Sequence, residues 1–106
     1  MLTDIVFVIK TPNLEGKELN ALRNDLKALA KPGRRLILDL SGVEKVNSMA
    51  ASMIVGIAGR LSQGGGCLKL VGAQKSVAAF FELLRVQRSV EMYSTQADVA
   101  WVPLAA

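Results

Sequence analysis

Short apolar runs alternate along this chain with longer segments in which apolar residues recur every three or four positions. The runs extend from Ile5 to Ile9, from Leu36 to Leu40, from Leu68 to Val71 and from Val90 to Tyr93. The first is continuously β-branched and aromatic, which is typical of a strand buried on both faces. Because strands that alternate with helices usually form a parallel sheet, this order predicts an α/β fold with a mostly parallel four-stranded sheet.

Three segments show helical periodicity. The first extends from Leu19 to Leu29, with charged residues between its leucines. The second extends from Ser48 to about Gln63 and stops at Gly64-Gly65-Gly66, because consecutive glycines destabilise a helix. The third extends from Val77 to Leu84. Thr95 followed by Asp98 matches a capping box, which predicts a fourth, short helix.

Length and composition narrow the class of protein. The 106 residues, 51% of them hydrophobic, fit one folded domain over residues 1–106. No apolar run approaches the roughly 20 residues of a membrane span, and the first residues lack the features of a signal peptide. A single cysteine, Cys67, suits a reducing compartment. We therefore expect a cytoplasmic domain that does not insert into a membrane.

Side chains suited to catalysis are scarce. Histidine is absent, which removes the commonest general base and metal ligand, and Cys67 has no histidine to activate it. We therefore predict a non-enzymatic protein with no metal and no cofactor. The net charge of +4 is dispersed apart from Lys31, Arg34 and Arg35, and no aromatic residue is interleaved with these cations. Nucleic-acid binding is therefore not predicted.

Two glycine segments invite comparison with phosphate-binding loops. Gly64-Gly65-Gly66 lies between a helix and the next strand, whereas phosphate loops lead from a strand into a helix. The segment from Gly72 to Ser76 has the right position but lacks the glycine before its lysine. Both are predicted to be turns, which leaves a nucleotide-binding or hydrolytic enzyme as the weakest hypothesis. Asp39, which interrupts an apolar strand, is predicted to accept hydrogen bonds from a loop backbone.

The most distinctive segment leads from the second predicted strand into the second predicted helix. Asn47 and Ser48 are both favoured helix N-caps, so one of them is expected to do no more than cap the helix. The same position would present a phosphate on Ser48 to backbone donors and to the positive end of the helix dipole.

The second predicted helix has two unlike faces. Four residues, Ala50, Ile54, Ile57 and Leu61, are expected to pack on the sheet. Methionines beside a glycine on the opposite side or at one edge suit the docking of a protein, although methionine is also an ordinary core residue. The predicted partner-binding surface comprises Asn47, Ser48, Met49, Ser52, Met53, Gly56 and Arg60.

The segment from Leu38 to Val43, which reads L-D-L-S-G-V, and the later Val46-Asn47-Ser48 resemble the D-L-S-G-V…D-S-x-G segment of STAS domains. The chain is most similar to the bacterial anti-sigma factor antagonists of that family. The likeness continues from Gly65 to Val71, from Val77 to Val86 and from Ser94 to Ala100. It implies a STAS-like sandwich with about four helices, and a mixed sheet if an extra N-terminal strand is present.

The resemblance also implies a function. In that family an anti-sigma factor, usually a serine kinase, binds the loop and helix that correspond to Val46 through Arg60 and phosphorylates the serine that matches Ser48. The unphosphorylated form binds the anti-sigma factor and releases the sigma factor, and a phosphatase resets the switch. The chain is accordingly expected to be an anti-sigma factor antagonist whose partners are a kinase and a phosphatase.

The chain also departs from the family pattern. Asn47 stands in place of an aspartate, Ala50 in place of a glycine and Ala51 in place of the common leucine. The first strand of the family has no counterpart here, which would expose a sheet edge and favour a homodimer. These departures support an alternative in which the domain is an accessory subunit of a lipid ABC transporter or a stress-sensing assembly and is not phosphorylated.

Overall fold

The structure is a computed structural model that describes residues 4–95. Its elements, in order, are β1 (Asp4–Val8), β2 (Asn13–Leu14), α1 (Gly16–Leu29), β3 (Arg35–Asp39), β4 (Lys45–Val46), α2 (Ser48–Gln63), β5 (Cys67–Val71), α3 (Lys75–Leu83), the 3-10 helix η1 (Val86–Arg88) and β6 (Glu91–Tyr93). This order confirms the predicted alternation of strands and helices, and the four predicted strands and the first three predicted helices lie within a few residues of the observed ones.

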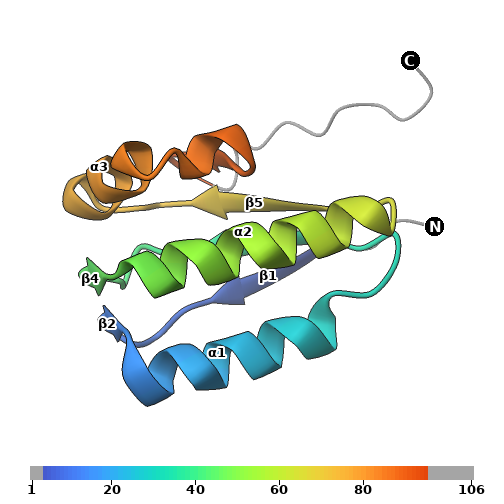
Figure 1. The fold of residues 1–106 in the computed structure, drawn as a ribbon, viewed down its shortest axis with the longest axis horizontal. Coiled ribbons are helices and arrows are strands. Elements are labelled where there is room, and N and C mark those ends of the chain that lie inside the picture. Colours follow the sequence, from blue (N-terminus) through green and yellow to red (C-terminus); the bar gives the residue numbers. More distant parts are fainter. Residues whose placement is uncertain (1–3, 96–106) are drawn as a thin grey trace.

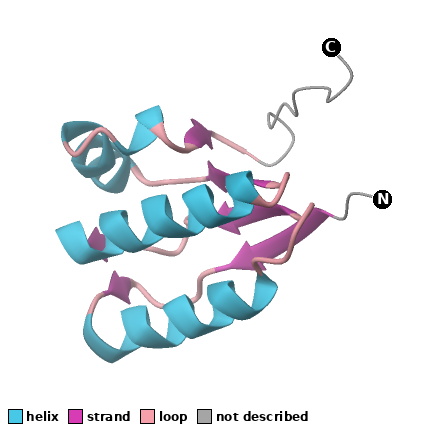
Figure 2. Ribbon diagram, turned by 45° about the vertical axis from the view of Figure 1, so that its right-hand side comes forward, coloured by secondary structure: helices cyan, strands magenta, loops and turns pink. Residues whose placement is uncertain are grey.

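Four of the strands form one parallel sheet. Their order is β1-β3-β5-β6, and each neighbouring pair is parallel. The short strands β2 and β4 form a separate parallel ladder beside the start of α2. Helices α1 and α2 lie side by side against one face of the sheet (Figures 1 and 2). The predicted α/β architecture is therefore correct.

The core lies between this helical layer and the sheet. Alternate residues of the strands face the helices, and the spacing of three to four residues along each helix brings its apolar side chains onto the same core. Each fully buried large apolar side chain contributes roughly 1.5–3 kcal/mol relative to its exposed state. The largest fully buried residues include Leu14, Leu26, Leu36, Leu38, Leu40, Ile54, Leu61, Leu70 and Phe81.

The part of the chain that the structure describes contains three α-helices and one 3-10 helix. The predicted short helix opened by Thr95 and Asp98 lies outside the described residues. Helix α3 ends one residue before the predicted end, and Leu84, expected on its apolar face, is 44% exposed. Over residues 4–95, no helix has both the length and the apolar character needed to cross a bilayer.

The prediction that the first strand is buried on both faces is wrong. On the face turned away from the helices, Val6 is 39% exposed and Val8 is 47% exposed. On the same face, Ile37 in β3 and Val71 in β5 are buried. The difference follows from position, because β3 and β5 have a strand on each side, whereas β1 has a neighbour on one side only within the described residues.

A charged pair joins β5 to β6 on the face of the sheet that is turned away from α1 and α2. Lys69 is buried, and its Nζ donates to the Glu91 carboxylate at 2.5 Å. The hydroxyl of Tyr93 donates to the other oxygen of the same carboxylate. These hydrogen bonds, that from Lys69 above all, hold the pKa of Glu91 below its ordinary value. The pair supplies the buried ammonium with an anionic partner, without which burying a charge is costly.

Candidate functional site

Helix α2 begins at the polar step that the sequence singles out. The side chain of Asn47 accepts a hydrogen bond from the Ala50 N–H at 2.9 Å, and its backbone is extended. Asn47 is therefore the N-cap, and Ser48 is the first residue of the helix. Asn47 is half-buried and turned back onto the helix, whereas Ser48 is exposed. This assignment leaves the hydroxyl of Ser48 free of the capping role.

Replacing Asn47 with alanine is expected to lower the free energy of unfolding by about 1 kcal/mol, because the Ala50 N–H would lose its acceptor. Asn47→Asp should retain the stability of the native protein, since a carboxylate caps equally well and favours the positive end of the helix dipole. Urea unfolding followed by circular dichroism measures both values. Equal losses in the two variants would contradict the capping role.

The loop that leads into α2 is fixed by hydrogen bonds from two neighbouring loops. The Asp39 carboxylate accepts from the Ser41 N–H at 2.9 Å, which confirms the role predicted for it. The side-chain amide of Gln74 donates to the Ser41 carbonyl at 3.0 Å, and the Glu44 N–H donates to the Pro12 carbonyl at 2.7 Å. The loop before α2 is therefore bonded on one side to the segment that follows β5 and on the other to the segment that follows β1.

Gly64 and Gly65 form a turn, as predicted, whereas residues 72–74 form an irregular loop between β5 and α3, and Lys75 and Ser76 begin α3. Gly65 has φ of +85° and Gly72 has φ of +72°, a region that favours glycine. At Gly72 a side chain would also approach the Asp39 carboxylate to 3.3 Å. In the segment from Gly72 to Ser76, Gln74 is engaged with the loop before α2. The glycines of these segments are thus accounted for by backbone geometry.

The faces of α2 are oriented as predicted. Ala50, Ile54, Ile57 and Leu61 are buried against the sheet. Met49 is 62% exposed, but Met53 is only 8% exposed. Met53 lies at the edge of α2 that faces α1, where it lines two hollows together with Arg23, which agrees with the prediction that these methionines tend outward or to one edge. The residues of the predicted surface that are exposed are Ser48, Met49, Ser52, Gly56 and Arg60.

A hollow lies between α2 and α1. Near the start of α2 it has a volume of about 420 Å³ and is lined by Arg23, Ser48, Met49, Ser52 and Met53. A second hollow, of about 250 Å³, lies further along the same seam and is lined by Arg23, Lys27, Met53, Gly56, Ile57 and Arg60. Three cations therefore border this side of α2, and Arg23 shares a hollow with the Ser48 hydroxyl.

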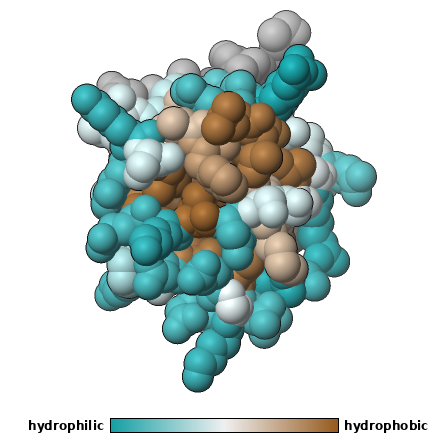
Figure 3. Space-filling model, turned by 60° about the vertical axis from the view of Figure 1, so that its left-hand side comes forward, coloured by the Kyte–Doolittle hydropathy of each residue, from teal (hydrophilic) through white to brown (hydrophobic). Residues whose placement is uncertain are grey.

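A third hollow lies on the other side of α2 and is more apolar. It has a volume of about 430 Å³ and is lined by Ser48, Ala51, Ser52, Val55, Gly56, Leu84 and Val86. Leu83, which precedes Leu84 in the chain, is 80% exposed. Figure 3 faces the end of the molecule where α2 begins and shows hydrophobic side chains gathered in a patch bordered by hydrophilic ones. Ser48 lines hollows on both sides of the helix.

Sequence reasoning missed four residues of this surface. Arg23 and Lys27 lie four residues apart on α1, and their spacing indicates only that they share a helix face. Leu83 and Leu84 come at the end of α3. Their contribution to a surface is visible only from their exposure in the structure. Together with the residues of α2 they form what we call the α2 surface, defined by Arg23, Lys27, Ser48, Met49, Ser52, Gly56, Arg60, Leu83 and Leu84.

The chemistry of the α2 surface is that of a binding face. It combines exposed apolar side chains, a glycine that allows close approach and a row of cations. A phosphate on Ser48 would lie at a helix N-terminus and in the hollow that Arg23 lines. Within residues 4–95, no group of three or more histidine, cysteine, aspartate or glutamate side chains is placed to hold a metal ion.

Comparison with known families and structures gives a consistent result. The family model of the STAS domain matches residues 7–99. No curated protein sequence matches the chain. An anti-sigma-factor antagonist (STAS) domain protein from Planctomyces limnophilus has a similar structure, with a TM-score of 0.78 and 20% identity over 92% of this chain and 86% of that chain.

Two further structures are similar. The Thermotoga maritima protein TM1081, assigned as an anti-sigma factor antagonist, matches in its NMR structure with a TM-score of 0.73 and 26% identity over 90% of this chain and 77% of that chain. The murine Solute Carrier 26 family member A9 anion transporter matches with a TM-score of 0.74 and 21% identity. That match covers 90% of this chain but only 17% of the transporter chain.

Proposed function

The chain belongs to the STAS domain family, and from this premise we propose that it is an anti-sigma factor antagonist switched by phosphorylation of Ser48. In this proposal the α2 surface binds an anti-sigma factor of the serine kinase type, and the sigma factor is released. The kinase phosphorylates Ser48, and a cognate phosphatase removes the phosphate. The protein thus acts by binding and not by catalysis.

The observation that carries the proposal is the position of Ser48. It is exposed, it follows the N-cap directly, and it lines hollows on both sides of α2. A partner that covers α2 must therefore enclose this hydroxyl. Phosphorylation would add about −1.5 to −2 charges inside the interface, where desolvation and repulsion oppose binding.

The charges around Ser48 indicate the kind of partner surface. Arg23, Lys27 and Arg60 line the seam beside α2, and the first turn of α2 contains no acidic residue. An acidic partner surface would complement this row and speed association. A new phosphate would compete with that acidic surface for the same cations, which gives the modification a second route to weaken the complex.

The proposal is tested by incubating the full chain with a purified anti-sigma factor of the serine kinase type and ATP, and then mapping phosphate by mass spectrometry. We expect a single phosphate on Ser48, none on Ser48→Ala and normal labelling of Ser52→Ala. Ser52 is a matched control because it is exposed one turn further along the same hollows. A phosphate on any other residue of the native chain would contradict the assignment.

A second candidate function is favoured by Asn47 and Ala50, which depart from the phosphorylated pattern of the family. In that case the α2 surface serves as the docking face of an accessory subunit in a transporter or a stress-sensing assembly. The similarity of the fold to part of an anion transporter is compatible with this reading. Affinity purification that recovers transporter ATPase subunits and no kinase would decide in its favour.

A further inference from the structure

Strand β1 lies at an edge of the sheet that the described residues form. Within residues 4–95, β1 pairs only with β3. The Ile9 N–H donates to the Asp39 carbonyl of β3 at 3.1 Å. Because backbone groups alternate in direction along a strand, the odd-numbered residues of β1 bond to β3 and the N–H and C=O groups of Val6 and Val8 point away from the sheet. Such an edge is a template for pairing with another strand.

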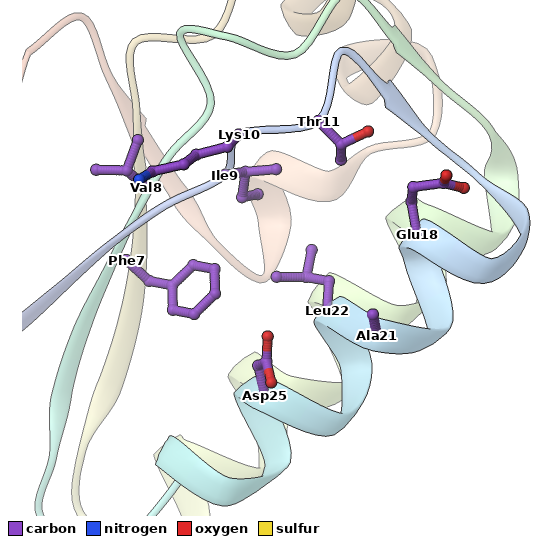
Figure 4. Close-up of a pocket in the computed structure, with 9 residues that line it drawn as sticks. All are labelled: Phe7, Val8, Ile9, Lys10, Thr11, Glu18, Ala21, Leu22 and Asp25. Carbon is purple, nitrogen blue, oxygen red and sulfur yellow. The ribbon is translucent and has the colours of Figure 1, made fainter.

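Side chains on both faces of β1 are placed to receive an added strand. On the face away from the helices, Val6 and Val8 are 39% and 47% exposed. On the helix side, a groove of about 400 Å³ separates β1 from α1. Figure 4 shows the Phe7 ring and the Leu22 side chain directed into this groove, while Val8 points away from α1. A strand laid along β1 would therefore bury apolar surface on both of its faces.

The sequence of β1 indicates which strand would pair with its outer edge. From Asp4 to Lys10 it reads Asp-Ile-Val-Phe-Val-Ile-Lys, which is a palindrome apart from its oppositely charged ends. We propose that β1 pairs antiparallel with β1 of a second copy of this chain, about a two-fold axis at Phe7. Ile5 then lies opposite Ile9, Val6 opposite Val8, and Asp4 opposite Lys10 of the second copy. The proposal is independent of the function assigned to the α2 surface.

The direction of the backbone groups agrees with this register. Antiparallel strands alternate between residue pairs that exchange two hydrogen bonds and pairs that exchange none. The axis at Phe7 makes Val6 and Val8 an exchanging pair, and the groups of both residues point outward. A shift of the axis to Val6 sets Asp4 opposite a valine, and a shift to Val8 sets it opposite Pro12, which has no N–H to donate.

The pairing would join the two four-stranded sheets into one continuous sheet. It would cover the β1 edge of each copy in an isologous dimer. Each Asp4 would lie opposite a lysine, and cross-strand pairs of opposite charge are stabilising. The apolar residues between the charged ends would face identical residue types from the second copy. An exposed apolar strand edge is usually blocked, because it would otherwise pair with further chains and aggregate. Pairing of the palindromic β1 strands in a dimer would cover the exposed valines in this way.

The first test is sedimentation equilibrium of the full chain over a concentration series. The native protein is expected to be a dimer, and Val8→Pro is expected to raise the dissociation constant by roughly tenfold or more, because it removes an outward N–H without removing a bond to β3. Circular dichroism verifies that Val8→Pro is folded. Leu83→Lys, which alters the exposed leucine of the α2 surface, should leave the dissociation constant unchanged. A native monomer at all concentrations would overturn the proposal.

The second test examines the register by charge reversal. Asp4→Lys sets lysine opposite lysine, and Lys10→Glu sets glutamate opposite aspartate, so each variant alone should dimerise at least about tenfold more weakly. In an equimolar mixture of the two variants, both ends of the pair again join opposite charges, and the dimer should return as a heterodimer. A mixture that associates no better than its separate components would show that the register is wrong.

Discussion

Replacing Gly66 with alanine is expected to lower the free energy of unfolding of the domain severely. A Cβ atom at this position would lie 2.0 Å from the Arg34 carbonyl oxygen and 2.9 Å from the Arg34 nitrogen. Real carbon atoms do not approach backbone this closely, so one of the two chain segments would have to move. The cost is expected to be about 3 kcal/mol or more, a large part of the 5–15 kcal/mol that stabilises a domain.

The segments that would have to separate are held by backbone hydrogen bonds. The Cys67 N–H donates to the Arg34 carbonyl at 3.1 Å at the point where β5 begins to pair with β3. The Gly33 N–H donates to the Gly64 carbonyl at 2.8 Å, and the Gly66 N–H donates to the Leu61 carbonyl at 2.8 Å. Movement at Gly66 would therefore disturb both the end of α2 and the centre of the sheet.

Gly59→Ala is the matched control, because it is the same substitution with the opposite expected sign. Gly59 lies inside α2, and among the described residues no atom other than its chain neighbours and the adjoining helix backbone lies within 4 Å of the added carbon. Alanine is favoured over glycine inside a helix, so the free energy of unfolding should rise by up to about 1 kcal/mol. Thermal and urea unfolding measure both variants. Similar midpoints for Gly66→Ala and the native chain would show that the close approach is easily relieved.

The contact of Gly66 with Arg34 also illustrates what the sequence can predict and what it cannot. Three consecutive glycines are enough to predict that a helix ends and a turn follows. Nothing in the local sequence indicates that the third glycine, and not the second, lies against the start of β3. That requirement comes from a segment about 30 residues earlier in the chain, and it appears only when β3 and β5 are paired.

The same reasoning applies to β1 and to Met53. A continuous apolar run predicts a strand, but its composition does not say whether the strand has a neighbour on both sides. Val6 and Val8 are exposed because β1 is at an edge of the sheet. For Met53, helical spacing gives the direction of the side chain, but its burial depends on how closely α1 approaches. Periodicity thus predicts elements and faces, while exposure is decided by packing between distant segments.

In the candidate site, too, local features are predicted from the sequence, whereas contacts between distant segments are not. The sequence predicts α2 from Ser48 to about Gln63 and its inward residues correctly, because capping and periodicity are local properties. The choice of Asn47 over Ser48 as the cap required the observed hydrogen bond to the Ala50 N–H. Arg23 enters the site from another helix. Only the packing of α1 against α2 brings it into the hollow that Ser48 lines.

Ser48→Asp is expected to weaken binding of the anti-sigma factor by about 100-fold or more, whereas Ser48→Ala should bind nearly as the native chain does. The aspartate places a charge at the centre of the α2 surface, where a bound partner would exclude water. Desolvation of this added charge and its repulsion by an acidic partner surface cost about 3 kcal/mol together, which corresponds to a change of roughly 100-fold. Isothermal titration calorimetry with the purified anti-sigma factor measures the dissociation constants directly.

Loss of stability can be separated from loss of binding in this experiment. An acidic side chain in the first turn of a helix interacts favourably with the helix dipole, so Ser48→Asp should unfold at the same urea concentration as the native chain or slightly above it. Ser62→Asp is the matched control, because Ser62 is exposed at the opposite end of the same helix and lines none of the hollows beside Ser48. It should bind like the native chain. Equal weakening by the two aspartates would mean that the effect is one of net charge, and the partner would then not be enclosing Ser48.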